Sequence, residues 1–444
     1  MTRHFLFNTV ILFLIPAVCP LWAENSYSAP DLSLFFDIHT VEENYEYRQR
    51  LKSLITAPKE EVLKAPSRIF TQGLTAQRVK FRVETRGNSF YLLFLNEKNR
   101  VFPIAGRGNY IIKRGLEMGE FKQIKIFYRN DPGSFIRIFP AGERSEMDVF
   151  LFGKSVYNKT ILPLPLENFL TLSFSRVIAL SGSVLKWPLL LMRGDRELDR
   201  RIEDIISLLR ARLPFLEDTD DGAQDSEGSF VLIKNGVKQE DAVNGGFNCS
   251  GFTKWITDGF YYPLTGSYLD IERLKVKHLD FRGNRWSLPY EEERDPYFGL
   301  DWSRNLAVNL ITAQSGAKEQ QSPVDPESAD LRRVDFFSYI EDVGYPVADL
   351  ETLLFAAAFR NPGIVYLGSI NSEYGKKPRL RQHFHIVVLL PYFTANGDFR
   401  IAVMERNSES SIASLIKRYP ADFIHLVRLD ARGVFQPPPE GVVE

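Results

Sequence analysis

The feature that most constrains the fold is the alternation of apolar and polar residues through residues 78–180. Val79, Phe81 and Val83 alternate with charged residues, and Ile124 and Ile126 repeat the pattern farther along the chain. A period of two residues is typical of strands that bury one face. Turn motifs rich in Gly, Asn and Pro separate these segments. We therefore expect a β-rich domain over residues 78–190, built as a sandwich or a barrel.

The segments before this domain have a different character. Residues 1–23 combine a positive start, a short apolar core and Ala23 at a suitable cleavage position, so we expect a secretory signal peptide. This leader predicts export to the periplasm or the cell envelope. Residues 24–77 are polar, and their central part is rich in helix formers with an interruption at Pro58. We expect a helical N-terminal segment there, with two short helices.

Composition excludes several classes of function. Lys and Arg number 55 and Asp and Glu number 56, a balance that gives no electrostatic attraction to nucleic acid. The chain has only two cysteines, Cys19 and Cys249, so a disulfide scaffold is excluded. Cleavage after Ala23 removes Cys19, unless Cys19 is itself a lipoprotein site, which its poor lipobox disfavours. The thiol of Cys249 is then either a buried bystander or a working group.

Residues 191–444 mix the patterns of helices and strands. Amphipathic helices are expected at 195–213, after Cys249 and at about 348–359, and strands at 364–367, 385–390, 399–404 and 423–429. Because helices come first and several strands follow, the order favours an α+β domain over repeating βαβ units. Residues of about 266–335 are rich in charged and aromatic residues. We expect an insertion there, which is a lid, a surface for envelope proteins or mere decoration.

Cys249 lies in the segment most suggestive of chemistry, residues 245–256. Apolar residues follow the thiol at helical spacing, which places it in the first turn of a helix after a loop with two glycines. A helix N-terminus favours the thiolate over the thiol. Its free N–H groups can also hold an oxyanion, and Asn248 and Ser250 adjoin that position.

A nucleophilic thiol needs a base, and two histidines are candidates. His383 and His385 fall on one face of a predicted strand that is otherwise apolar, where an unpartnered polar ring is costly. We prefer His385 because the apolar run begins directly after it, and His383 is the alternate. The pair with Cys249 also raises the question of a metal, but only three ligands are apparent, so we expect neither metal nor cofactor.

Taken together, these segments resemble the NlpC-type family of papain-like cell-wall cysteine peptidases, over about residues 195–444. Cys249 lies in a matching Cys-Ser-Gly-Phe motif that follows a glycine pair, and His385 opens a matching apolar strand. The family has a third polar residue on the next strand, and Glu405 stands in that place, with Asn407 as the alternate. Asn248 replaces the usual Asp, Val387 replaces a small residue, and the spacing from Cys249 to His385 is long.

The resemblance implies a papain-like α+β catalytic domain behind the β-rich domain. It implies an exported cysteine hydrolase that cleaves amide bonds of peptidoglycan stem peptides, with peptidoglycan or its peptide fragments as the partner. In this mechanism Cys249 attacks, His385 transfers the proton, and Glu405 or Asn407 orients the imidazole. Two alternatives stay open. One is a papain-like acyltransferase or transglutaminase-like enzyme, and the other is a non-catalytic envelope protein that retains the fold.

Overall fold

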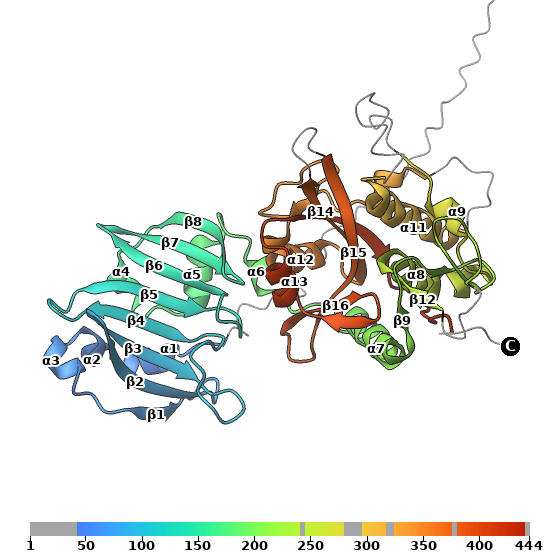
Figure 1. Ribbon diagram of the computed structural model, residues 1–444. Coiled ribbons are helices and arrows are strands. Elements are labelled where there is room, and N and C mark those ends of the chain that lie inside the picture. The colour runs from blue at the N-terminus through green and yellow to red at the C-terminus, as the bar shows by residue number, and fades with distance from the viewer. Residues whose placement is uncertain (1–41, 240–244, 279–294, 317–323, 375–379, 440–444) are drawn as a thin grey trace, which may run out of the picture.

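The computed structural model describes residues 42–239, 245–278, 295–316, 324–374 and 380–439. Within these ranges the chain forms a β-rich N-terminal region and a mixed α/β C-terminal region (Figure 1). The expected signal peptide, with Cys19, lies outside the described residues. In the described ranges, no helix combines the length and the apolar character that crossing a bilayer requires.

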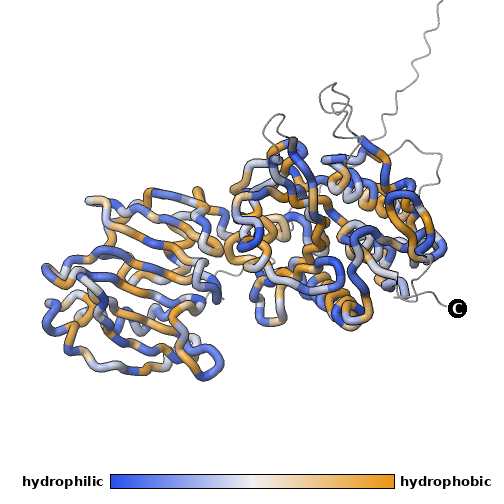
Figure 2. Tube along the Cα trace, viewed as in Figure 1, coloured by the Kyte–Doolittle hydropathy of each residue, from blue (hydrophilic) through white to orange (hydrophobic). Residues whose placement is uncertain are grey.

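The N-terminal region is built on one antiparallel sheet whose eight strands pair in sequence order. Figure 2 shows the alternation of apolar and polar residues along these strands. The strands are β1 (Arg68–Thr71), β2 (Arg78–Arg86), β3 (Ser89–Asn96), β4 (Tyr110–Gly115), β5 (Phe121–Phe127), β6 (Phe135–Ala141), β7 (Arg144–Leu151) and β8 (Lys154–Leu162). The sheet is an open meander with β1 and β8 at its edges, and so it is neither the sandwich nor the barrel that we expected.

We expected strands to form a second layer against this sheet, but short helices form it instead. They bury one face of the sheet, including Phe81, Ile126 and Ile136, so no apolar face remains there for a second sheet to cover. The helices are α1 (Tyr45–Arg50), α2 (Lys52–Thr56), α3 (Lys59–Val62), α4 (Leu166–Phe169), α5 (Phe174–Ser181) and α6 (Trp187–Leu191).

The expected helical segment at residues 24–77 is helical only in part. Residues 24–41 lie outside the described ranges. Breaks at Leu51 and Pro58 leave three short helices instead of two, and strand β1 follows them. β1 pairs with β2 through Phe70, whose ring stacks on Tyr47 of α1 at 4.9 Å. The sheet therefore begins before residue 78.

The C-terminal region is built on a six-stranded antiparallel sheet with the order β13-β18-β14-β15-β16-β17. Its strands are β13 (Tyr345–Pro346), β14 (Ile364–Tyr374), β15 (Leu380–Phe393), β16 (Phe399–Glu405), β17 (Ser408–Ser410) and β18 (Phe423–Asp430). One face packs against α7 (Arg196–Arg212), α8 (Cys249–Thr265) and α11 (Phe298–Gln314). The other face packs against α12 (Leu350–Arg360) and α13 (Ile412–Arg418).

Smaller elements connect these layers. The parallel pair β9 (Glu217–Asp218) and β12 (Gly246–Phe247) leads into α8, and a hairpin of β10 (Ala223–Gln224) and β11 (Phe230–Val231) lies beside them. The remaining elements of the described ranges are α9 (Ile271–Leu274) and the 3₁₀ helices η2 (Leu213–Phe215), η4 (Pro326–Ala329) and η5 (Val347–Asp349).

The expected insertion at about residues 266–335 contains part of the C-terminal core. Helix α11 lies within it and packs against α8 and the sheet. Trp302 is fully buried and donates its indole N–H to the carbonyl of Ser250 at 2.9 Å. Its neighbour Arg304 is also buried and pairs with Asp330 at 2.7 Å. Because α11 is packed into the core, this part of the segment supports the fold and is not an appended lid.

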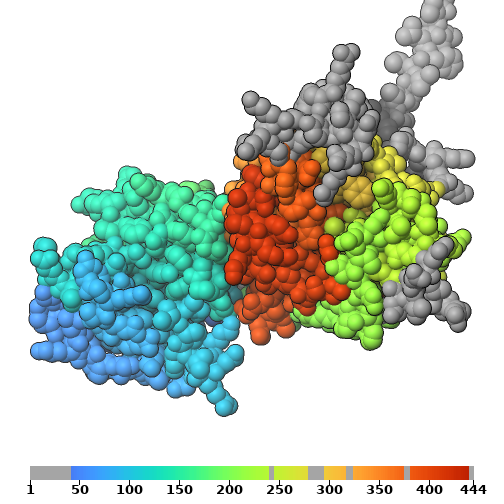
Figure 3. Space-filling view, viewed as in Figure 1, coloured from blue at the N-terminus to red at the C-terminus, as the bar shows by residue number. Residues whose placement is uncertain are grey.

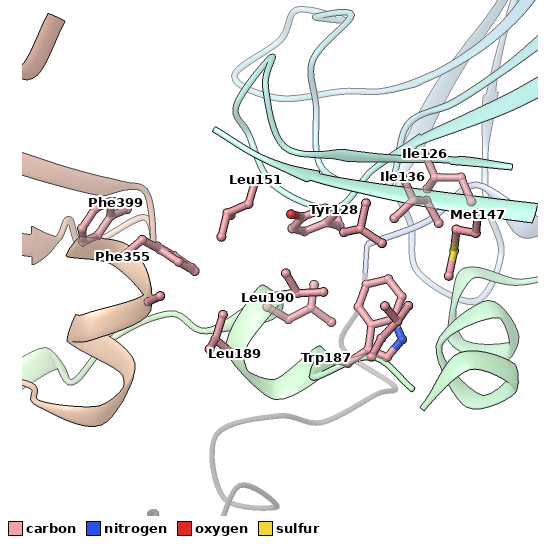
Figure 4. Close-up of a cluster of buried hydrophobic side chains, with 14 of the residues drawn as sticks. Ile126, Tyr128, Ile136, Met147, Leu151, Trp187, Leu189, Leu190, Phe355 and Phe399 are labelled. Atoms are coloured by element: carbon pink, nitrogen blue, oxygen red, sulfur yellow. The ribbon is translucent and has the colours of Figure 1, made fainter. Parts of the chain in front are cut away.

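The two regions share one hydrophobic core. Figure 3 shows them in contact, and Figure 4 shows Leu151 and Tyr128 of the N-terminal region near Phe355 and Phe399 of the C-terminal region. Residues of α6 fill the space between the two sets, and all of them belong to a single cluster of buried side chains. This contact is apolar like a domain interior, so we expect the regions to move together.

Arg129 fixes this interface from inside the core. Its guanidinium donates to the carbonyls of Leu190 (3.3 Å), Met192 (2.9 Å) and Gly397 (3.2 Å), which come from both regions. The same group lies over the ring of Phe355, 4.5 Å from its centroid. Burial lowers the pKa of Arg129 to about 10, so the side chain keeps its charge at neutral pH.

We predict that Arg129→Ala lowers the free energy of unfolding by about 2–4 kcal/mol, because buried carbonyls lose their donor and the core gains a cavity. Chemical denaturation measures the change. Arg78→Ala is the control, because Arg78 is half exposed and pairs with Glu97 at the surface, where a pair contributes less than about 1 kcal/mol. Equal losses in the two variants would contradict the role given to Arg129.

Candidate active site

Cys249 is the first residue of helix α8, and Asn248 is the N-cap. The side-chain Oδ1 of Asn248 accepts a hydrogen bond from the N–H of Gly251 at 2.9 Å. Asn and Asp are equally good in this role, so Asn248 caps the helix as well as the Asp that the resemblance led us to expect. The N–H groups of Cys249 and Ser250 have no acceptor within the helix and are available to a bound oxyanion.

Glycines allow the first turn of α8 to approach the preceding loops. A Cβ atom at Gly251 would lie 1.9 Å from the carbonyl oxygen of Gly222. A Cβ atom at Gly246 would lie 2.2 Å from a methyl group of Thr219. Neither position has room for a side chain. The glycines of the motif therefore set the position of the thiol.

The partner of α8 is the free edge of strand β15. Strand β16 pairs with β15 only from Val388 to Phe393, so within the described residues the backbone of β15 before Val388 has no strand on that side. The N–H of Ile386 donates to the sulfur of Cys249, and the side chain of His385 hydrogen-bonds the same sulfur. The edge of the sheet thus supplies two groups that favour the thiolate.

A carboxylate and an arginine continue the chain of contacts. His385 Nε2 lies 2.9 Å from Glu405 Oε2, which leaves Nδ1 for the thiol. The other oxygen of Glu405 forms an ion pair with Arg418 at the end of α13. Tyr419 places its ring 6.3 Å from the imidazole. Cys249, His385 and Glu405 are therefore brought together, and Arg418 holds the carboxylate.

These contacts set the charges of the site. Burial opposes ionisation of Cys249, but the interaction with His385 and the Ile386 N–H outweigh it and lower the pKa of the thiol. Burial also opposes protonation of His385, but Cys249 and Glu405 raise its pKa to about 9. Burial disfavours the Glu405 carboxylate, yet His385 and Arg418 lower its pKa to about 2. The arrangement stabilises a thiolate–imidazolium pair at neutral pH.

His385 and not His383 contacts the thiol, although we expected the two histidines to share a face. A β-bulge in β15 makes Phe384 an extra residue between them, because Ile370 pairs with His385 and the next residue of β14 pairs with His383. The alternation of sides is interrupted there. His383 is buried and contacts Ser369 Oγ through Nδ1 at 3.0 Å. Burial keeps its pKa well below the usual value, so it is neutral.

Three other residues singled out in the sequence have structural positions. Asn407 donates its amide to the carbonyl of Leu216 at 3.1 Å, so it anchors a loop, and Glu405 takes the place beside the imidazole. Ser250 is buried, and its carbonyl accepts from Trp302. Val387 packs in the cluster that includes α12 and α13, on the face of the sheet away from α8, so its size does not obstruct the thiol.

A pocket of about 570 Å³ borders the imidazole and the carboxylate. Its lining is mostly polar and includes Asp218, Arg406, Glu409, Arg418 and Tyr419. Arg406 pairs with Asp218 at 2.7 Å, and its charge favours the thiolate. Sequence reasoning missed both arginines and the Ile386 N–H. No local motif marks any of these groups, because the fold brings each of them to Cys249 or Glu405 from a distant part of the sequence.

Among the described residues, one group of acidic side chains has oxygens close enough together for a metal. Glu327, Glu341 and Asp342 each offer an oxygen within 4.8 Å of the others. Arg332 already pairs with Glu327 and Glu341, and Arg304 pairs with Asp342 at 2.8 Å. These arginines neutralise the cluster, so we assign it no metal.

We predict that Gly251→Ala destabilises the protein by about 1–3 kcal/mol, because the added methyl group collides with backbone. Thermal and chemical denaturation measure the loss. Gly433→Ala is the matched control, since nothing lies within 4 Å of the methyl group there. A Gly251→Ala variant as stable as the parent would refute the close contact.

We predict that His385→Ala slows alkylation of Cys249 by iodoacetamide at neutral pH by about tenfold or more, because burial then raises the pKa of the thiol without the opposing imidazole. Alkylation rates measured against pH give the result. His278→Ala is the control, because His278 bonds to Asn305 instead. An unchanged rate in His385→Ala would favour a bystander thiol.

Comparison with known proteins reaches only the N-terminal region. A family model described as a domain of unknown function (DUF8515) matches residues 38–189, about a third of the chain. No curated protein and no solved structure matches the chain. The matched range ends before Cys249, His385 and Glu405.

Proposed function

We propose that this chain is a papain-like cysteine hydrolase of amide bonds. The observation that carries the proposal is the bonded series Cys249–His385–Glu405, in which a thiol at a helix N-terminus meets an imidazole oriented by a carboxylate. Nucleophile, base and orienting group in this order form the triad of acyl-transfer enzymes. The expected papain-like fold is part of the same proposal.

Each residue has a defined step in this reaction. The Cys249 thiolate attacks the carbonyl carbon, and the N–H groups at the start of α8 stabilise the oxyanion. His385 then gives its proton to the leaving amine, and a thioester remains on the sulfur. A water molecule passes a proton to His385 and attacks the thioester. The acid product leaves, and the thiolate and the imidazolium are restored.

Peptidoglycan stem peptides are the proposed substrate, and the support for them is the family resemblance. The pocket beside the triad adds a consistent observation. It contains the cations Arg406 and Arg418 and the acids Asp218 and Glu409, groups that suit a short peptide with free carboxylates and amines. The expected signal peptide would place the enzyme where this substrate occurs.

Digestion of purified sacculi tests the proposal. We predict that the parent protein releases muropeptides with new amino and carboxyl ends, and that Cys249→Ala lowers the rate by about a thousandfold or more. Mass spectrometry of the soluble products measures both. Digestion should fall as the pH rises through about 9, because His385 then loses the proton that the leaving amine needs.

Two other outcomes are informative. Products that carry an added acyl acceptor in place of new ends would identify the chain as an acyltransferase or transglutaminase-like enzyme. Equal release by the parent and Cys249→Ala would reject a catalytic thiol and favour a non-catalytic envelope protein.

A further inference from the structure

The N-terminal sheet has a second face, turned away from the helices, which we call the outer face. In the view of Figure 1, α4 and α5 lie behind the strands. Because side chains alternate along each strand, the residues between the core positions lie on the outer face. They include the aromatic residues Tyr91, Phe127, Phe135, Phe139 and Phe150 and the cations Lys80, Arg82, Lys113, Lys125 and Arg137.

Two cations stand directly opposite each other at the centre of the outer face. Lys125 of β5 pairs in register with Arg137 of β6. Like charges at such a position destabilise a sheet. Aromatic rings nevertheless hold both side chains in place: the Lys125 ammonium lies 3.5 Å from the centroid of Phe135, and the Arg137 guanidinium lies 4.4 Å from that of Phe150. Burial and the charge of Arg137 lower the pKa of Lys125.

The charges of the outer face are only partly balanced within the described residues. Asp148 lies 3.7 Å from Arg137, and Glu84 pairs with Arg82 at 2.7 Å. In the same described ranges, Lys80, Lys113 and Lys125 make no ion pair. The Nε atoms of Arg82 and Arg137 are buried and have no hydrogen-bond acceptor in these ranges. Buried donors without acceptors are uncommon, and both of these belong to guanidinium groups of the outer face.

We propose that the outer face binds an anionic glycan, a polysaccharide that carries carboxylates. The cations pair with the carboxylates, and the acids Glu84, Glu146 and Asp148 on the same face accept hydrogen bonds from sugar hydroxyls. This proposal rests on the outer face alone and holds whether or not Cys249 is catalytic.

The arrangement of the rings favours a glycan over a single-stranded nucleic acid. Nucleic-acid platforms offer open aromatic faces on which bases stack. Here Phe135 and Phe150 stack on each other with centroids 4.8 Å apart. The Lys125 ammonium also lies over the ring of Phe135, and the Arg137 guanidinium lies over that of Phe150. The rings therefore brace the cations and do not form a stacking platform.

Affinity electrophoresis and calorimetry with the full chain test the proposal. The protein carries Cys249→Ala, so that binding is measured without cleavage. The probes are hyaluronate, a polymer with one carboxylate in each disaccharide, neutral dextran and an oligothymidylate. We predict that hyaluronate binds, that dextran does not, and that the affinity for hyaluronate falls with added salt.

The double variant Lys125→Gln/Arg137→Gln should weaken hyaluronate binding by about tenfold or more. It relieves the repulsion between the two cations, so the fold should persist, and circular dichroism checks this. The control Lys52→Gln/Lys64→Gln removes the same charge from the helical side and should bind as the parent does. No hyaluronate binding, equal binding by both double variants, or tighter binding of the oligothymidylate would overturn the proposal. Loss of sacculus digestion alone would leave it standing.

Discussion

The candidate active site depends on the point at which strand β16 stops. β16 ends at Glu405, so the last residue of the strand places its carboxylate beside His385. The same ending leaves the edge of β15 unpaired, and α8 brings Cys249 to the N–H of Ile386. If the ladder continued to Ile386, a backbone carbonyl would take the N–H that now meets the thiol. The end of a strand therefore assembles nucleophile, base and carboxylate.

Charge alternates along the site from thiolate to imidazolium, carboxylate and guanidinium. The thiol, the imidazole and the carboxylate are partly or wholly buried, and burying any one of these charges alone would cost several kcal/mol, whereas the Arg418 guanidinium lies at the surface. The neighbouring opposite charge offsets that cost at each step. Because the third member is Glu405 and not a neutral amide, the site also needs Arg418. The position of α13 therefore influences the charge state of Cys249, although the two are far apart in the sequence.

Local patterns were enough to predict some of this architecture. The alternation through residues 78–180 predicted strands, and the spacing after Cys249 predicted a helix that begins at the thiol. Interactions across the chain decided the rest. Helices cover the N-terminal sheet because they supply the apolar area that a second sheet would have supplied. The bulge at Phe384 separates His383 from His385, and strand periodicity alone does not reveal an extra residue. A tryptophan in a charged and aromatic segment can lie in a surface loop or in the core. Only the packing of Trp302 shows that it lies in the core.

Helix α6 carries a consequence for how this chain can be divided. The match to the domain of unknown function ends at residue 189, inside α6, and our own boundary at residues 190–191 falls in the same helix. A chain cut there would leave Leu189 in one piece and Leu190 in the other, although both are buried in the core that the two regions share. Arg129 would lose carbonyls from the second piece. A gene fragment that ended at that boundary would encode a protein with part of the shared core exposed to solvent. We therefore expect the two regions to be inherited together.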